Sequence, residues 1–248
     1  MQMGLRIFMH SVNLVLNQLQ GALRISGVLY IASLVVSLVS YYFAMQAVMT
    51  DPTPPLPSII LGIVVGFLYL WIAVAWHRFV LLDEMPQTLL PPFHGDRMAA
   101  YFGRSVVLFL VILLIAIVLG FINGIVIAAT NGSPFALMLT TLIIVFVALV
   151  LSYRLAPMFP AAAVGRAMSL RDAWAATDGA NGTIVALAPI SALASVVVDL
   201  PVFLIQSLPG GPFIAFLWTA VTSWFKLLIG VSILTTLYGV YVEKRDIA

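Results

Sequence analysis

Two charged side chains inside apolar segments are the strongest candidates for chemistry in this sequence. Asp199 and Lys226 lie in consecutive apolar segments, about 183–206 and 213–242, which are joined by a short turn. Charged residues are costly in hydrocarbon, and they mark ion pairs, proton relays or substrate paths. We expect a structural ion pair that stabilises the last hairpin. Two alternatives stay open: Asp199 reaches the outer interface of the membrane, or both residues line a proton or ion path.

The histidines offer no metal site. A zinc site needs three or four ligands in a closed arrangement, and the chain has three histidines, no cysteine and no His-Glu-x-x-His motif. Serine-hydrolase and phosphate-binding motifs are also absent from the sequence. We therefore predict no catalytic residue, no metal ligand and no cofactor. A further alternative is a membrane enzyme that acts on lipid headgroups through His77, Asp83, Glu84 and His94.

The composition is that of an integral membrane protein. Hydrophobic residues make up 63% of the 248-residue chain and charged residues 8%, whereas a soluble domain has about 25% charged residues. Because the apolar runs are continuous over about 20 residues or more, they predict spanning helices and not a β-barrel. We expect one all-α domain, residues 1–248, with six transmembrane helices in three hairpins. The predicted spans are about 25–49, 58–82, 99–129, 135–154, 183–206 and 213–242, and a proline-rich turn, DPTPPLP, ends the first span.

Basic residues predict the orientation of these spans. In a six-span arrangement every basic residue except Lys226 falls on one side of the membrane, and cytosolic loops are the ones enriched in lysine and arginine. The residues on that side are Arg6, Arg24, Arg78, Arg97, Arg104, Arg154, Arg166, Arg171, Lys244 and Arg245. We therefore expect both termini in the cytosol and a location in a bacterial inner membrane. Because the positive-inside rule explains these charges, we predict no nucleic-acid partner.

Short amphipathic helices are expected at the cytosolic interface. Residues 5–20 place apolar side chains at steps of three and four, with a polar stripe opposite, which is typical of a helix lying in the interface. In the joint 151–183, Ser169 and Asp172 form a capping-box pattern that predicts the start of a short helix carrying Trp174. The residues expected at the interface are Trp76, Arg78, Arg154 and Trp174.

Small residues at regular spacing predict close helix packing. Two pairs have the Gly-x-x-x-Gly spacing that lets helix backbones approach in a membrane. Four serines follow one face of the first span. These residues are Gly62, Gly66, Gly120, Gly124, Ser26, Ser33, Ser37 and Ser40. The contacts can form within the chain or with another protein, and for each motif taken alone we expect the former.

The pattern of joints and spans repeats along the chain. Units of about 1–82, 83–156 and 157–248 each contain a cytosolic interfacial segment, a helix, a short neutral turn and a second helix. Parallel repeats occur in some transporters. Successive insertion of helical hairpins produces the same pattern without any functional demand, and we prefer that explanation.

Two segments carry a family resemblance. MSLRDAWAATDGANGT, residues 168–183, and HSVNLVLNQLQGALRIS, residues 10–26, resemble joints in a loose group of bacterial six-span proteins. That group includes the YciC-like inner-membrane proteins and the membrane domain attached to some glycerophosphodiester phosphodiesterases. The resemblance implies a non-enzymatic membrane module. It transfers no catalytic residue, because the phosphodiesterase domain is absent and its His-Arg-Gly signature has only His77-Arg78-Phe79 as a distant counterpart.

These patterns lead to two functional hypotheses. The first is a non-catalytic inner-membrane protein that acts as an accessory, assembly or scaffolding subunit through helix-face contacts. Its partners would be membrane lipids and a larger membrane complex or further copies of itself. The alternative is a small oligomeric transporter or channel component with Asp199 and Lys226 at a polar path.

Overall fold

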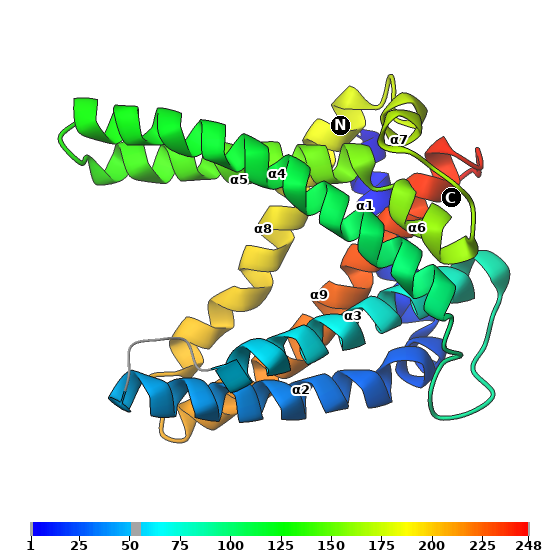
Figure 1. Cartoon of the computed structure of the whole chain (residues 1–248), viewed down its shortest axis with the longest axis horizontal. Helices are drawn as coiled ribbons and strands as arrows, with labels where there is room; N and C mark the ends of the chain where they lie inside the picture. Colours follow the sequence, from blue (N-terminus) through cyan, green and yellow to red (C-terminus); the bar gives the residue numbers. More distant parts are fainter. Residues whose placement is uncertain (1, 51–55, 248) are drawn as a thin grey trace. The chain divides into compact units, whose positions relative to one another are not determined.

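The protein folds as a set of long apolar helices (Figure 1). The computed structural model describes residues 2–50 and 56–247, and these residues form nine α-helices and no β-strand. The predicted turn DPTPPLP falls largely on residues 51–55, outside the described part. The helices are α1 (Gln2–Asn17), α2 (Leu19–Thr50), α3 (Leu56–Leu82), α4 (Gly95–Ala129), α5 (Pro134–Leu155), α6 (Met158–Val164), α7 (Leu170–Ala176), α8 (Asn181–Ile205) and α9 (Gly211–Tyr241).

The predicted all-α membrane fold is confirmed. Six segments of the described chain are long and apolar enough to cross a membrane, and each of the six predicted spans overlaps one of them over most of its length. A helix satisfies its own backbone hydrogen bonds, so a continuous apolar segment is stable as a helix in hydrocarbon. The six segments are Leu19–Gln46, Leu56–Leu82, Gly95–Ala129, Pro134–Val164, Asn181–Ile205 and Gly211–Tyr241.

The helices contribute to two compact units. Unit 1 contains Met1–His10, Ala100–Val197 and Ile233–Ala248, and unit 2 contains Ser11–Ala99 and Val198–Ser232. Each unit therefore combines stretches that are distant in sequence. The division falls inside α1, α4, α8 and α9, and not at the boundaries of the three consecutive units predicted from the sequence.

In unit 2, α2 is the centre of a network of hydrogen bonds between helices. It pairs with α3, where the hydroxyls of Ser40 and Ser58 each donate to the other residue's carbonyl oxygen, at 3.4 and 3.2 Å. It also contacts α9, because the Trp224 indole donates to Ser26 Oγ at 2.8 Å and the Tyr30 hydroxyl donates to the Ala220 carbonyl oxygen at 2.6 Å. Polar side chains thus connect the spanning helices of this unit.

Trp76 belongs to the interior of unit 2, and its predicted position at the membrane interface stays a prediction. The side chain is fully buried, and its indole nitrogen donates to Ser232 Oγ on α9 at 2.9 Å. A buried indole requires an acceptor, and Ser232 supplies one inside the protein. His77, the next residue, is also fully buried.

In unit 1, the start of α1 packs closely against the start of α8. A Cβ atom placed on Gly4 would lie 2.8 Å from the Thr183 carbonyl oxygen and 3.1 Å from Ala186 Cβ. Such a distance is below van der Waals contact, so only glycine permits this approach. In the same unit, the Arg6 guanidinium of α1 donates to the Ile247 carbonyl oxygen near the C-terminus.

The helices α4 and α5 of unit 1 are also joined by a hydrogen bond. The Thr140 hydroxyl on α5 donates to Asn123 Oδ1 on α4 at 2.5 Å.

The first helix has three faces where the sequence predicted two. Its predicted apolar stripe is open to the surroundings, with Leu5, Met9 and Leu16 exposed by 50%, 47% and 52%. This exposure is the one required of a helix that lies in the membrane interface. A third stripe, not predicted, is buried in the protein and consists of Gly4, Ile7, Ser11 and Val15.

Candidate functional site

Asp199 and Lys226 form an ion pair between α8 and α9, within unit 2. Lys226 Nζ lies 2.7 Å from Asp199 Oδ1 and 2.9 Å from Oδ2, so the ammonium group contacts both carboxylate oxygens. The Lys226 side chain remains 30% exposed and the Asp199 side chain 44% exposed. Each charge in this hairpin is therefore balanced by the other, as the preferred hypothesis of a structural pair requires.

The two residues meet although Lys226 lies further from the shared turn. The Trp218 indole donates to the Val198 carbonyl oxygen at 3.0 Å, so Trp218 is level with the residue next to Asp199. Lys226 is eight residues further along α9, or about 12 Å along the helix axis. Helical side chains tilt toward the N-terminus of their helix, which in α9 is the end at the turn. The aliphatic stem of Lys226 covers the remaining distance toward Asp199.

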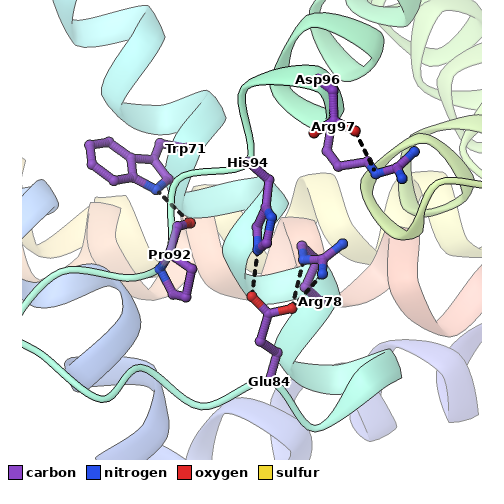
Figure 2. A network of polar contacts seen from close by, with 7 residues as sticks. All are labelled: Trp71, Arg78, Glu84, Pro92, His94, Asp96 and Arg97. Carbon is purple, nitrogen blue, oxygen red and sulfur yellow. Dashed lines mark hydrogen bonds and ion pairs between the residues drawn. The ribbon is translucent and has the colours of Figure 1, made fainter.

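A second charged cluster lies at the end of α3 and in the loop that follows it (Figure 2). Glu84, just after α3, accepts hydrogen bonds from Nε and Nη2 of Arg78 at 2.9 and 2.5 Å. Its other oxygen lies 2.5 Å from His94 Nε2, directly before α4. Figure 2 shows Glu84 between these two partners, with Trp71 donating to the Pro92 carbonyl oxygen at 3.4 Å nearby. We call the three charged residues the Arg78–Glu84–His94 network.

The network stabilises the ionised form of Glu84. Partial burial alone would raise the pKa of this carboxyl, but hydrogen bonds and charge from Arg78 and His94 lower it overall, below its ordinary value of 4.5. The network joins both ends of the loop between α3 and α4, because Arg78 precedes the loop and His94 ends it. Its first role in the fold is therefore to fix the path of that loop.

The structure brings together only part of the residue set of the enzyme hypothesis. Glu84 and His94 are in contact, whereas Asp83 is exposed with a φ of 55° and His77 is fully buried. General acid–base catalysis needs groups that converge on one accessible point. Within residues 2–50 and 56–247, no group of three or more His, Cys, Asp or Glu side chains is placed to hold a metal ion.

In unit 1, Arg154 and Trp174 lie against each other. The Arg154 guanidinium carbon lies 4.2 Å from the centre of the Trp174 ring, and Nη1 donates to the Thr177 carbonyl oxygen at 2.5 Å. The Thr177 hydroxyl donates to the Arg154 carbonyl oxygen at 3.0 Å. Arg154 is 6% exposed and Trp174 46% exposed. The arginine predicted at the interface thus joins the end of α5 to the short helix α7.

The helix that carries Trp174 begins at the residue predicted from the sequence. Ser169 Oγ accepts from the Asp172 backbone nitrogen at 3.1 Å, and Asp172 Oδ2 accepts from the Ser169 backbone nitrogen at 2.9 Å. These reciprocal bonds form a capping box at the start of α7. The hydrogen bonds from Ser169 also lower the pKa of the Asp172 carboxyl.

The serine face of α2 is used inside the chain. Ser26 and Ser33 are fully buried, and Ser26 accepts from the α9 indole described above. Ser40 contacts α3 through Ser58, and Ser37 is half-buried on the same helix. These contacts agree with close packing of α2 within unit 2.

The glycine pairs are not used in this way. Gly62, Gly66, Gly120 and Gly124 are all exposed, and a Cβ atom on any of them would meet no described atom within 4 Å. The expected packing of these glycines is therefore not found among the described residues of unit 2, which holds Gly62 and Gly66, or of unit 1, which holds Gly120 and Gly124. Their close-approach faces on α3 and α4 are open.

Sequence reasoning missed the role of Glu84 as a shared partner of Arg78 and His94. The available signal was a pair of adjacent acids, Asp83 and Glu84, in a joint with basic residues at both of its ends. Sequence reasoning also missed Tyr153, which lies in unit 1 and donates to Ser191 Oγ at 2.7 Å. Hydrogen bonds of this kind depend on which helices are neighbours, and a single sequence does not reveal that.

Comparisons with protein-family models, curated proteins and solved structures found no match to this chain. The resemblance to bacterial six-span proteins therefore stays a prediction that rests on its two motifs.

Proposed function

We propose that this protein is a non-catalytic membrane protein that acts as an accessory, assembly or scaffolding subunit through its helix faces. The observation that carries the proposal is the contrast between its two kinds of small-residue face. The serine face of α2 is filled by neighbouring helices, whereas the faces of Gly62, Gly66, Gly120 and Gly124 have no described atom against them. A second protein would occupy these open faces.

The cost of glycine in a helix supports this interpretation. Glycine destabilises a helix interior by roughly 0.5–1 kcal/mol relative to alanine, and a helix that faces only lipid gains nothing from it. A small-residue pair at this spacing becomes favourable when a second helix packs against it, because van der Waals contact replaces the missing side chain. The pairs on α3 and α4 therefore favour association with another spanning helix.

The polar contacts in the spanning segments support a structural role for the charged pair. Asp199 and Lys226 neutralise each other, and the indoles of Trp76 and Trp224 are paired with serines. Polar side chains that hydrogen-bond to one another or neutralise each other's charge connect the helices, and they leave fewer free groups to coordinate a moving ion. The pair would therefore maintain the last hairpin as a stable surface for assembly.

The composition and mass of the gently extracted particle test the proposal. We expect native mass spectrometry to show a stoichiometric complex with another membrane protein or a homo-oligomer. The double variant Gly62→Ile/Gly66→Ile should dissociate that particle, while Val64→Ile, a change on the other side of α3, should not. A monomer for the unaltered protein, or equal behaviour of both variants, would reject association through this face.

A transporter or channel component is the second candidate, favoured by one observation. A cavity of about 480 Å³ lies at the turn end of the α8–α9 hairpin and is lined by Gln206, Pro212, Ala215, Phe216 and Thr219. The Asp199–Lys226 pair is partly exposed on the same hairpin. In proteoliposomes with an imposed pH gradient, a proton path predicts leakage that Asp199→Asn abolishes while the protein stays folded. Absence of leakage from the unaltered protein would exclude a proton path.

The proposal includes a bacterial inner-membrane location with both termini in the cytosol. The support is the distribution of basic residues, since Lys226 is the one basic residue outside the proposed cytosolic side and it is neutralised by Asp199. Because the chain has no cysteine, single cysteines at Gln2 and Asp246 could be labelled with a membrane-impermeant maleimide. We expect no labelling in intact cells and labelling after the membrane is permeabilised.

A further inference from the structure

A groove with both polar and apolar walls lies in unit 2, beside the start of α2. Its volume is about 470 Å³. The helix contributes Gln20, Leu23, Arg24 and Val28, and the loop between α3 and α4 contributes Gln87, Thr88 and Leu89. The lining therefore contains one cationic group, two amides, one hydroxyl and no acidic residue. This charge balance matches an anionic ligand.

Arg24 is the group best placed to hold an anion. Its side chain is exposed, and it forms no ion pair with the described residues. Guanidinium groups bind phosphate oxygens through two parallel hydrogen bonds. Gln20 lies one helical turn earlier on the same face, and Gln87 approaches from the loop. Their amide groups add donors around the same position.

The apolar part of the groove continues along the spanning part of α2. Val28 lies one turn beyond Arg24, and Ile31 and Val35 extend the same helical face. These three side chains are 45%, 62% and 55% exposed. From Arg24 to Val35 the helix rises about 16 Å, a length over which a fatty acyl chain can lie against it. The groove thus joins an anion-binding end to an apolar face directed into the membrane.

The loop wall of the groove is fixed before any ligand binds. The Arg78–Glu84–His94 network joins its two ends. Near the groove, a Cβ atom on Gly21 would lie 3.5 Å from Met85 Cε, so the loop packs closely on α2 at this glycine. The Thr88 hydroxyl donates to the Leu90 carbonyl oxygen at 2.8 Å, within a bend of the loop. A wall fixed in this way lowers the entropic cost of binding.

We propose that this groove is a binding site for an anionic glycerophospholipid. Arg24, with Gln20 and Gln87, binds the headgroup phosphate, and an acyl chain lies along Val28, Ile31 and Val35. Thr88 accepts a hydrogen bond from a headgroup hydroxyl, since its own proton is donated to Leu90. The site differs from general attraction of basic residues to an acidic membrane, because it requires one arginine and one loop conformation.

Lipid titration followed by native mass spectrometry tests this site. The purified full chain would be titrated with phosphatidylglycerol and, separately, with phosphatidylcholine. We expect preferential binding of phosphatidylglycerol, and Arg24→Gln should weaken that binding by at least about tenfold, the value of one charge-assisted hydrogen bond. Arg171→Gln is the matched control, because Arg171 is an exposed arginine on α7 outside the groove.

A second variant and a second ligand keep the test decisive. Leu89→Glu places a negative charge in the groove at a side chain that is 80% exposed, so it should abolish the lipid preference without disturbing the fold. Soluble glycerol phosphate should compete only weakly, because it lacks the acyl chain. The proposal would be overturned by an equal loss of phosphatidylglycerol binding in Arg24→Gln and Arg171→Gln. It would also be overturned by equal binding of the two lipids, or by full competition from glycerol phosphate.

Discussion

Glu84 shows how one side chain determines the path of a loop. It is one of two acids between Arg78 and His94 in the sequence, and it contacts both of these residues. The network crosses the loop between α3 and α4, so it replaces the regular hydrogen bonds that the loop lacks. Removing the carboxylate would leave two basic groups facing each other.

The pH dependence of stability should report the Glu84 network. Because the pKa of this carboxyl is lowered below 4.5 in the folded protein, its contribution is present above that value and is lost as pH falls through the folded pKa. Glu84→Gln should lower the unfolding temperature at about pH 7 by roughly 2–4 °C. The unfolding temperature of this variant should also fall less than that of the unaltered protein as the pH is made acidic. Thermal unfolding in detergent across this range measures both effects.

Asp83→Asn provides the control for that experiment. Asp83 is adjacent and exposed, and asparagine tolerates its left-handed backbone. This variant should retain the pH profile of the unaltered protein. If Glu84→Gln also retained that profile, the network would have no role in stability.

Arg154 uses its planar guanidinium in two ways at once. It stacks on Trp174 and donates to the Thr177 carbonyl oxygen. Lysine keeps the charge but cannot reproduce both contacts, so Arg154→Lys should lower the free energy of unfolding by about 1–3 kcal/mol. Arg171→Lys, at an exposed position, should have little effect in the same unfolding measurement. The stacking account would be wrong if Arg154→Lys were equally costly with and without Trp174→Leu.

At the scale of elements, the α8–α9 hairpin depends on the Asp199–Lys226 pair. Asp199→Asn and Lys226→Met should each lower stability by about 1–2 kcal/mol, because each leaves a charge without its partner in a spanning segment. The double variant should lose less than the sum of the two single effects. Thermal unfolding of the four proteins gives this coupling energy. Additive losses, or single variants as stable as the unaltered protein, would contradict a structural pair.

The elements differ in how far the sequence could predict them. The spans were predictable because apolar length alone specifies a membrane helix, and the start of α7 because Ser169 and Asp172 form a local motif. The short helix α6 was not predicted. Its prolines, Pro157 and Pro160, lie at the N-cap and in the first turn, where a missing backbone N–H costs nothing.

The sequence could not predict which side chains of the spanning helices are buried against protein and which face lipid. Lipid-facing and protein-facing positions are both apolar in spanning helices, so the sequence did not reveal that the Trp76 side chain is buried inside unit 2. For the same reason, the glycine spacing predicted a contact but not its partner. The third face of α1 had a weak signal, since Gly4 and Ser11 are small residues at helical spacing along one stripe.

At the scale of the whole molecule, the protein has extensive spanning surface and few groups that could perform chemistry. Several of its spanning polar groups are used in contacts, such as Trp76 with Ser232 and Asp199 with Lys226. The open glycine faces on α3 and α4 are the features that a solitary membrane protein would not need. The central claim is therefore that another protein packs against these faces.

Site-specific photo-crosslinking in the native membrane tests that claim most directly. A photoreactive amino acid at Ile59 would lie on the same side of α3 as Gly62 and Gly66, and one at Val64 would lie on the opposite side. Both positions are exposed, by 51% and 39%. We expect a discrete protein adduct from Ile59 that Gly62→Ile/Gly66→Ile removes, and no such adduct from Val64. Adducts of equal yield at both positions, or none at Ile59, would contradict the account.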